Sequence, residues 1–110
     1  MTAKTIRGPR QYLRFPEEFG VTDPPDPAPL KATETYKADA ALIQHEVARM
    51  VTEQMARLNI TYDDLAAQVG TSVEQLRRVL RGESPMSIER LHHLAAITGL
   101  TVKTTVTRDE

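Results

Sequence analysis

Two short helices joined by a glycine turn form the signal that most constrains the fold of this chain. Apolar residues recur at helical spacing over Tyr62–Val69 and again over residues 72–81, so we expect one helix in each stretch. Gly70 lies between them, where a residue in the left-handed conformation ends a helix. Ala66, four residues before Gly70, and Leu76, six residues after it, complete the spacing that is typical of a helix-turn-helix unit.

Each of these helices starts with a capping pair. Thr61 is followed three residues later by Asp64, and Ser72 is followed at the same distance by Gln75. The hydroxyl of the first residue can accept a hydrogen bond from an early backbone N–H of the helix, and the second side chain can reach back. The pairs therefore predict where both helices begin.

Helices are also expected on either side of this unit. Residues 39–58 have apolar side chains at helical spacing, with Asp39 near the N-cap and a break at Asn59. A fourth helix over residues 88–98 is capped by Ser87. The core of the chain is therefore predicted to be all-α, over residues 39–99.

The last segment changes its periodicity from helical to alternating. Apolar or β-branched residues alternate with polar ones over residues 100–107, which predicts a β-strand. A lone strand is not stable in water, so we expect it to pair with the same strand of a second copy. Residues 100–110 would then form a dimerisation strand, with these side chains on one face: Leu100, Val102, Thr104 and Val106.

Residues 1–38 have a different composition and are expected to form a basic, proline-rich, flexible arm. All but one of the seven prolines lie before residue 30, and residues 23–27 cannot form a helix. Its apolar content either docks on the helices or on a partner, or packs loosely: Tyr12, Leu13, Phe15 and Phe19.

Residues 51–100 resemble the phage-repressor and Cro type of helix-turn-helix domain. Residues 58–66 are similar to the opening of that family's motif, residues 69–72 to its turn, residues 76–82 to the end of its recognition helix, and residues 86–91 to the helix that follows. The resemblance implies a compact bundle of four to five helices, of the lambda-repressor-like type. It also implies a DNA-binding transcriptional regulator, a repressor or autoregulator, that works as a homodimer.

An outward-facing helix over residues 72–81 would enter the major groove with its first turns toward the base edges. Glutamine pairs with adenine, arginine with guanine, and glutamate accepts from cytosine, while valine contacts a thymine methyl group. The expected base contacts are Val73, Glu74, Gln75, Arg77 and Arg78. The alternative is that the arginines form solvated surface and that Gln75 serves only as a capping partner.

Phosphate contacts are expected from hydroxyl and guanidinium groups around the same two helices. Tyr62 stands where the family has a short polar residue that touches phosphate, and its hydroxyl can still donate; alternatively, it packs at the domain edge. The expected phosphate contacts are Thr61, Tyr62, Ser72, Arg78 and Arg81.

Positive charge is concentrated at the N-terminus although the chain carries a net charge of -1. Residues 1–14 contain four basic side chains and no acidic one. This arm would follow the DNA backbone or enter a minor groove, or else form a disordered tail. The expected arm contacts are Lys4, Arg7, Arg10 and Arg14.

Two functions remain open, and a third class is disfavoured. The first is the homodimeric regulator bound to double-stranded DNA. The second is an antitoxin-like module whose N-terminal arm wraps a protein partner, with DNA binding secondary. An enzyme is not expected, because the chain lacks cysteine, a glycine-rich phosphate loop and a recognisable pair of nucleophile and base.

The sequence predicts neither a metal nor a cofactor. His92 and His93 are adjacent and would point about 100° apart on a helix, which does not suit a shared metal ion. No apolar run approaches the length of a membrane span, and no apolar stretch follows the basic N-terminus as in a secretory signal. We expect a cytoplasmic protein.

Overall fold

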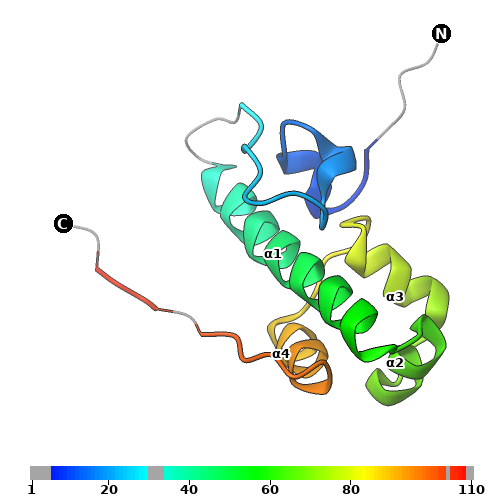
Figure 1. The fold of residues 1–110 in the computed structure, drawn as a ribbon. Helices are drawn as coiled ribbons and strands as arrows, with labels where there is room; N and C mark the ends of the chain where they lie inside the picture. The colour runs from blue at the N-terminus through cyan, green and yellow to red at the C-terminus, as the bar shows by residue number, and fades with distance from the viewer. Residues whose placement is uncertain (1–5, 30–33, 104, 109–110) are drawn as a thin grey trace, which may run out of the picture.

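The computed structural model describes residues 6–29, 34–103 and 105–108, and their architecture is helical (Figure 1). The elements are the 3-10 helices η1 (Pro9–Tyr12) and η2 (Pro16–Glu18) and the α-helices α1 (Thr35–Leu58), α2 (Tyr62–Val69), α3 (Val73–Leu80) and α4 (Ile88–Ile97). The predicted all-α class is confirmed. Among the described helices, none combines the length and the apolar character that crossing a membrane requires.

Helix α1 begins one turn earlier than the sequence predicted. It starts at Thr35 rather than near Asp39, and it continues to Leu58 as expected. Asp39 is exposed, whereas Ala38 beside it is buried against the rest of the chain. Burial of Ala38 in the first turn therefore outweighs the local preference of aspartate for a capping position. Asn59 ends the helix in the left-handed conformation, with φ of 55°.

The core lies between α1 and the three shorter helices, which are drawn below and to the right of α1 in Figure 1. Small side chains on α1 let the other helices approach it closely, and branched side chains fill the space between them. The central members are Ala48, Val51, Leu65, Leu76 and Leu94, all nearly inaccessible to solvent. This packing fixes how the two motif helices are held.

The predicted helix starts and stops are confirmed with small changes at the ends. The hydroxyls of Thr61, Ser72 and Ser87 each accept a hydrogen bond, at 3.1 Å, from the backbone N–H three residues on. Gly70 ends α2 in the left-handed conformation, with φ of 81°. Helix α3 ends at Leu80 and α4 at Ile97, one residue before the expected ends, and the following residues occupy the C-cap positions.

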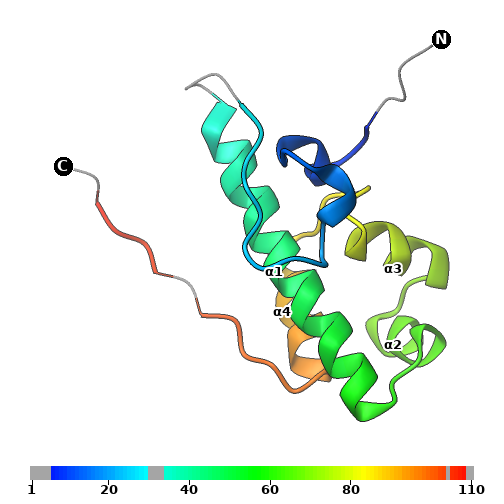
Figure 2. The ribbon, with the colours of Figure 1, turned by 45° about the horizontal axis from the view of Figure 1, so that its top comes forward.

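The described part of the N-terminal segment packs on the helices. Residues 6–29 lie beside the first half of α1 and the end of α3 in both Figure 1 and Figure 2. Leu13 is 1% exposed and Phe19 is 5% exposed, and both belong to the hydrophobic core. Of the alternatives that the sequence left open, docking on the chain's own helices is the one found here.

Polar contacts from α1 hold this segment in place. The backbone N–H of Gly20 donates to His45 Nδ1 at 2.7 Å, so Nδ1 carries no proton. The Nε2–H of the same fully buried ring then donates to the Thr22 carbonyl. Both ring nitrogens of His45 are therefore used to bind the N-terminal segment, and the histidine is a neutral structural residue.

Gln44 ties α1 to the connection between α3 and α4. Its Nε2 donates to the carbonyls of Val79 and Ser84, each at 2.9 Å. Its Oε1 accepts from the N–H of Met86 at 3.0 Å. The three contacts join α1 to the last turn of α3 and to the loop that follows it, so this buried side chain fixes the exit from α3.

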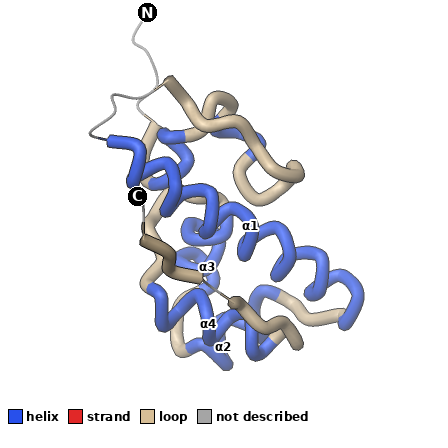
Figure 3. The backbone as a smooth tube through the Cα atoms, turned by 90° about the vertical axis from the view of Figure 1, so that its left-hand side faces the viewer, coloured by secondary structure: helices blue, strands red, loops and turns tan. Residues whose placement is uncertain are grey.

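The predicted C-terminal strand is not supported. Within residues 100–103 and 105–108 no strand is formed, and Figure 3 shows only helix and loop in the described part of the chain. Leu100 and Val102 are half-buried against the core, whereas residues 105–108 run away from the helices and Val106 is 95% exposed. Alternation alone predicted the strand, but a strand also needs a neighbour to receive its hydrogen bonds. Thr104 lies outside the described residues.

Candidate nucleic-acid interface

Helix α3 turns a charged face to solvent. Leu76, Val79 and Leu80 are buried on the opposite side. The solvent face lines an open hollow of about 440 Å³ together with parts of the neighbouring loop: Val73, Glu74, Arg77, Arg78, Arg81 and Glu83. The helix is therefore held by its apolar side and presents three arginines outward, which is the orientation that groove binding requires.

Two of the residues expected to meet bases are paired with each other. Arg78 Nη2 lies 2.6 Å from Glu74 Oε1, and both side chains are more than half exposed. One turn of helix separates them, so the contact is an i,i+4 ion pair across the solvent face. The pair keeps one positive and one negative charge side by side on the solvent face of the helix.

A cation–π contact joins α2 to α3. The guanidinium group of Arg77 lies over the ring of Tyr62, with its central carbon 5.2 Å from the ring centre. Tyr62 is half-buried and packs against the core, so its ring forms a fixed platform. Cation–π attraction holds Arg77 on this platform and orients it along the solvent face.

A family model for Cro/C1-type helix-turn-helix DNA-binding domains matches residues 50–107. The chain belongs to this family. The match begins in the last third of α1 and includes α2, α3 and α4, and thus the whole charged face of α3. No curated protein and no solved structure matches the chain.

Not all predicted base contacts lie on one face of this Cro/C1-type domain. Gln75 turns to the flank of α3 and lines a separate hollow of about 270 Å³, next to Ser87 and Arg90 at the start of α4. Val73 is half-buried and packs partly on the core. The structure thus groups Glu74 with the arginines and separates Gln75 from them. The sequence did not indicate that Arg90 lies beside Gln75.

The predicted phosphate contacts lie at the two helix starts and at the end of α3. Thr61 and Ser72 are exposed, and their oxygens accept the capping hydrogen bonds. A hydroxyl that accepts in this way still has its own proton to donate to a phosphate. Arg81 is exposed at the C-cap of α3 and lines the same hollow as Arg77.

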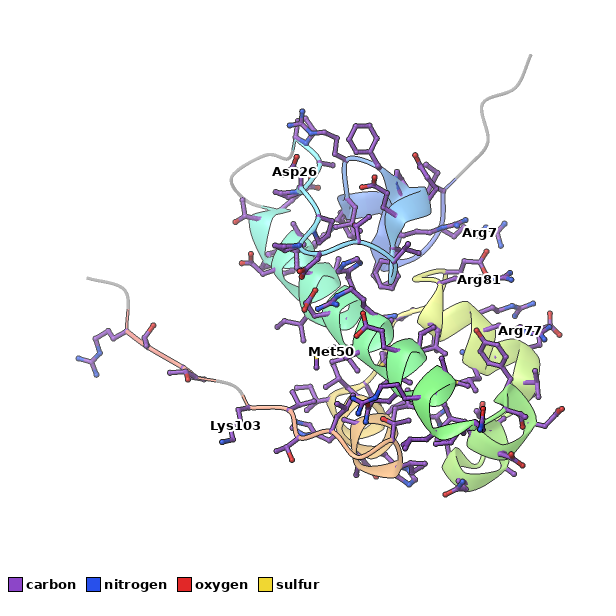
Figure 4. The ribbon with its side chains drawn as sticks, viewed as in Figure 1. Arg7, Asp26, Met50, Arg77, Arg81 and Lys103 are labelled. Atoms are coloured by element: carbon purple, nitrogen blue, oxygen red, sulfur yellow. The ribbon has the colours of Figure 1, made fainter. Side chains whose placement is uncertain are left out.

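The predicted arm residues separate into two groups. Arg7 and Arg10 line a polar hollow with Arg78 of α3. In Figure 4, Arg7, Arg81 and Arg77 follow one another along one side of the molecule. Arg14 does not join them, because its backbone N–H is bonded to the carbonyl of Asp26, which Figure 4 places far from Arg7. Lys4 lies outside the described residues.

The described residues contain no metal-binding cluster of three or more histidine, aspartate or glutamate side chains. His92 and His93 are exposed on α4, far in sequence from the buried His45. The imidazole of His45 has both nitrogens bonded to backbone groups.

Proposed function

We propose that this Cro/C1-type domain is a sequence-specific regulator that reads the major groove of double-stranded DNA with α3. The observation that carries the proposal is the exposed row formed by Arg77, Arg78 and Arg81 on a helix whose other face is buried. A helix held in this way can enter the groove without any change in the fold.

The side chains on this row have different roles in the proposal. Arg77 and Arg78 contact guanine, and Glu74 accepts from cytosine and repels phosphates where no cytosine is present. Arg81, Thr61 and Ser72 contact the backbone and fix the register. Val73 lines the same hollow as the arginines and contacts a thymine methyl group, whereas Gln75 contributes from the flank of the helix.

We further propose that two copies bind together, with their α3 helices in successive major grooves roughly 34 Å apart. An apolar stripe on α1 supports a second copy as the partner. Tyr36, Ile43 and Met50 follow one another at seven-residue intervals, and the last two are 48% and 42% exposed. Such a stripe is costly in water and is covered when two helices pack together.

Selection from a random pool of duplexes tests the DNA-reading proposal. The full chain should enrich one motif, and the double variant Arg77→Ala plus Arg78→Ala should lose the enrichment. The matched control, Lys103→Ala plus Arg108→Ala, removes the same charge outside the row of arginines and should keep the motif. Binding without enrichment by the unmodified chain would refute sequence reading.

A second candidate is a protein-binding module. One observation favours it: an apolar hollow of about 540 Å³ between η1, α1 and the start of α4, lined by Tyr12, Tyr36, Ile43, Met86 and Ile88 among others. A partner would bind this folded surface, since the described N-terminal segment is already docked.

Light scattering of the purified chain separates the dimer from this second candidate. A dimer that Ile43→Asp converts to a monomer, while Ile43→Leu does not, supports self-association through α1. A monomer at all concentrations that also fails to enrich DNA shifts the weight to a protein partner.

A further inference from the structure

Three arginines from distant parts of the sequence meet at the junction between the N-terminal segment and the end of α3. Arg7 and Arg10 precede or belong to η1, whereas Arg78 is on α3. Together with Glu83 and Ser84 they line a polar hollow of about 320 Å³. One carboxylate faces three guanidinium groups there, so the hollow carries an excess of positive charge.

Nearby carboxylates offset this charge only in part. Arg10 Nη2 is 3.6 Å from Glu83 Oε1, which is a long contact for an ion pair. The Nε atom of Arg10 is buried and has no hydrogen-bond partner among the described residues. Arg78 is paired with Glu74 on the side of α3 that faces the larger hollow. Like charges held together in this way favour an added anion.

Backbone contacts, rather than the arginine side chains, hold the N-terminal segment against this site. Gly8 has φ of 77°, and a Cβ atom at this position would overlap the carbonyl group of Glu83. The N–H of Arg10 donates to the carbonyl of Gly82 at 3.1 Å. The anchoring of Leu13 in the core completes the attachment. The guanidinium groups are therefore brought together before any ligand arrives.

The hollow is continuous with the charged face of α3. Arg78 and Glu83 line both hollows. The row of Arg77, Arg81 and Arg7 in Figure 4 passes from one to the other without turning to another side of the molecule. A linear polyanion lying along α3 would meet the N-terminal segment next.

We propose that Arg7, Arg10 and Arg78 form a binding site for a phosphate group. Planar guanidinium groups offer paired N–H donors that match phosphate oxygens, and several of them around one hollow bind it more selectively than a single charge does. The phosphate belongs either to the DNA backbone or to a free phosphate ion. If the phosphate belongs to DNA, the site rests on the proposed function. It then extends the protein's contact with the DNA backbone beyond the groove that α3 enters.

The first arm of the test uses DNA. A duplex carrying the selected motif and an unrelated duplex are titrated with the full chain by fluorescence anisotropy, over a range of potassium chloride concentrations. The variant Arg7→Gln plus Arg10→Gln should bind both duplexes about three- to tenfold more weakly. Its plot of log affinity against log salt should be shallower by about 1, because one phosphate contact is lost.

Matched variants and melting curves show whether a change in DNA binding comes from the hollow itself. Lys103→Gln plus Arg108→Gln makes the same charge change outside the hollow and should leave the salt slope unchanged. Arg10→Gln also removes the contact to Glu83, so Arg7→Gln alone is measured as well, with circular dichroism melts for all variants. Arg7 is exposed and precedes η1, so its replacement should leave the melt unchanged and still flatten the slope.

The second arm uses inorganic phosphate alone. Sodium phosphate is titrated into the full chain at constant ionic strength, and the Nε–H signals of Arg7, Arg10 and Arg78 are followed by NMR. Saturable shifts of the three signals, with the Arg78 shift lost in the Arg7→Gln plus Arg10→Gln variant, support the site even if the chain binds no duplex and the proposed function fails. Shifts with an unchanged DNA slope assign the site to free phosphate. No saturable shift together with control-like DNA binding would overturn the proposal.

Discussion

The guanidinium group of Arg77, on the charged face of α3, lies over the phenol ring of Tyr62 at the start of α2, with its central carbon 5.2 Å from the ring centre. The ring belongs to a residue for which the sequence suggested a phosphate contact through the hydroxyl. Its position under Arg77 gives it a second role, since the ring limits where the arginine can reach. The two roles can be separated by substitution.

Removing the ring should weaken DNA binding more than removing the hydroxyl. Tyr62→Leu keeps an apolar side chain but loses the aromatic face, so we expect affinity to fall about two- to fivefold, in line with an exposed cation–π contact. Tyr62→Phe retains the ring and should bind nearly as well as the unmodified chain. Anisotropy titrations on the selected duplex measure both. Equal losses in the two variants would instead assign the effect to the hydroxyl.

Breaking the pair between Glu74 and Arg78 should make binding tighter and less selective. Glu74→Gln removes a carboxylate from the proposed DNA face and releases Arg78, whose nitrogen lies 2.6 Å from it. We expect affinity for an unrelated duplex to rise about three- to tenfold, because a charge that repels phosphates is gone. Asp39→Asn makes the same charge change on the exposed surface of α1 and should have little effect. An unchanged ratio between selected and unrelated duplexes would contradict a role for Glu74 in selectivity.

Two glycines with similar backbone angles should respond very differently to alanine. Gly70 has φ of 81° and open space around it, whereas Gly82 has φ of 75° and faces the ring of Phe19. Gly70→Ala should cost about 1–2 kcal/mol in the free energy of unfolding, from the left-handed conformation alone. Gly82→Ala should cost about 2–5 kcal/mol, because the methyl group also displaces a buried ring. Urea denaturation gives both values, and equal losses would mean that the Phe19 contact contributes nothing.

Acid should remove the stabilising effect of one ion pair on α1. Hydrogen bonds from Arg49, at 2.9 and 3.1 Å, hold the pKa of Glu46 below its ordinary value of 4.5. A lowered pKa in the folded state stabilises the fold above the unfolded-state pKa, and this effect is lost as pH falls through the folded-state pKa. The difference in stability between the unmodified chain and Glu46→Gln should thus be present near pH 7 and shrink below about pH 4.5.

Urea denaturation between pH 3 and 7 measures this difference. The Glu46 side chain is 40% exposed, so the effect is small and weakens further with salt. Glu17→Gln on η2 is the charge-matched control. A gap between Glu46→Gln and the unmodified chain that widens on acidification would contradict the assignment.

The amino-acid sequence determined the helix-turn-helix unit nearly to the residue. Its boundaries depend on contacts between neighbours in the chain, such as Ser72 with the N–H of Gln75, and on the left-handed Gly70. These contacts join near neighbours in the chain, so their positions can be predicted without the tertiary structure, although packing is needed to stabilise such short helices. The buried face of α3 follows from the spacing of Leu76, Val79 and Leu80 for the same reason.

The tertiary structure alone decided which distant groups meet. The proline-rich segment has no periodicity, so its docking depends on Leu13 and Phe19 finding the core and on His45 receiving Gly20. Arg7 and Arg78 are brought together only because that segment packs where α3 ends. The strand expected at the C-terminus illustrates the reverse case, since alternation is local but a strand needs a neighbour. Helix capping depends on residues a few positions apart in the sequence. Burial of side chains, and the distances between charged groups from different segments, depend on how the whole chain packs.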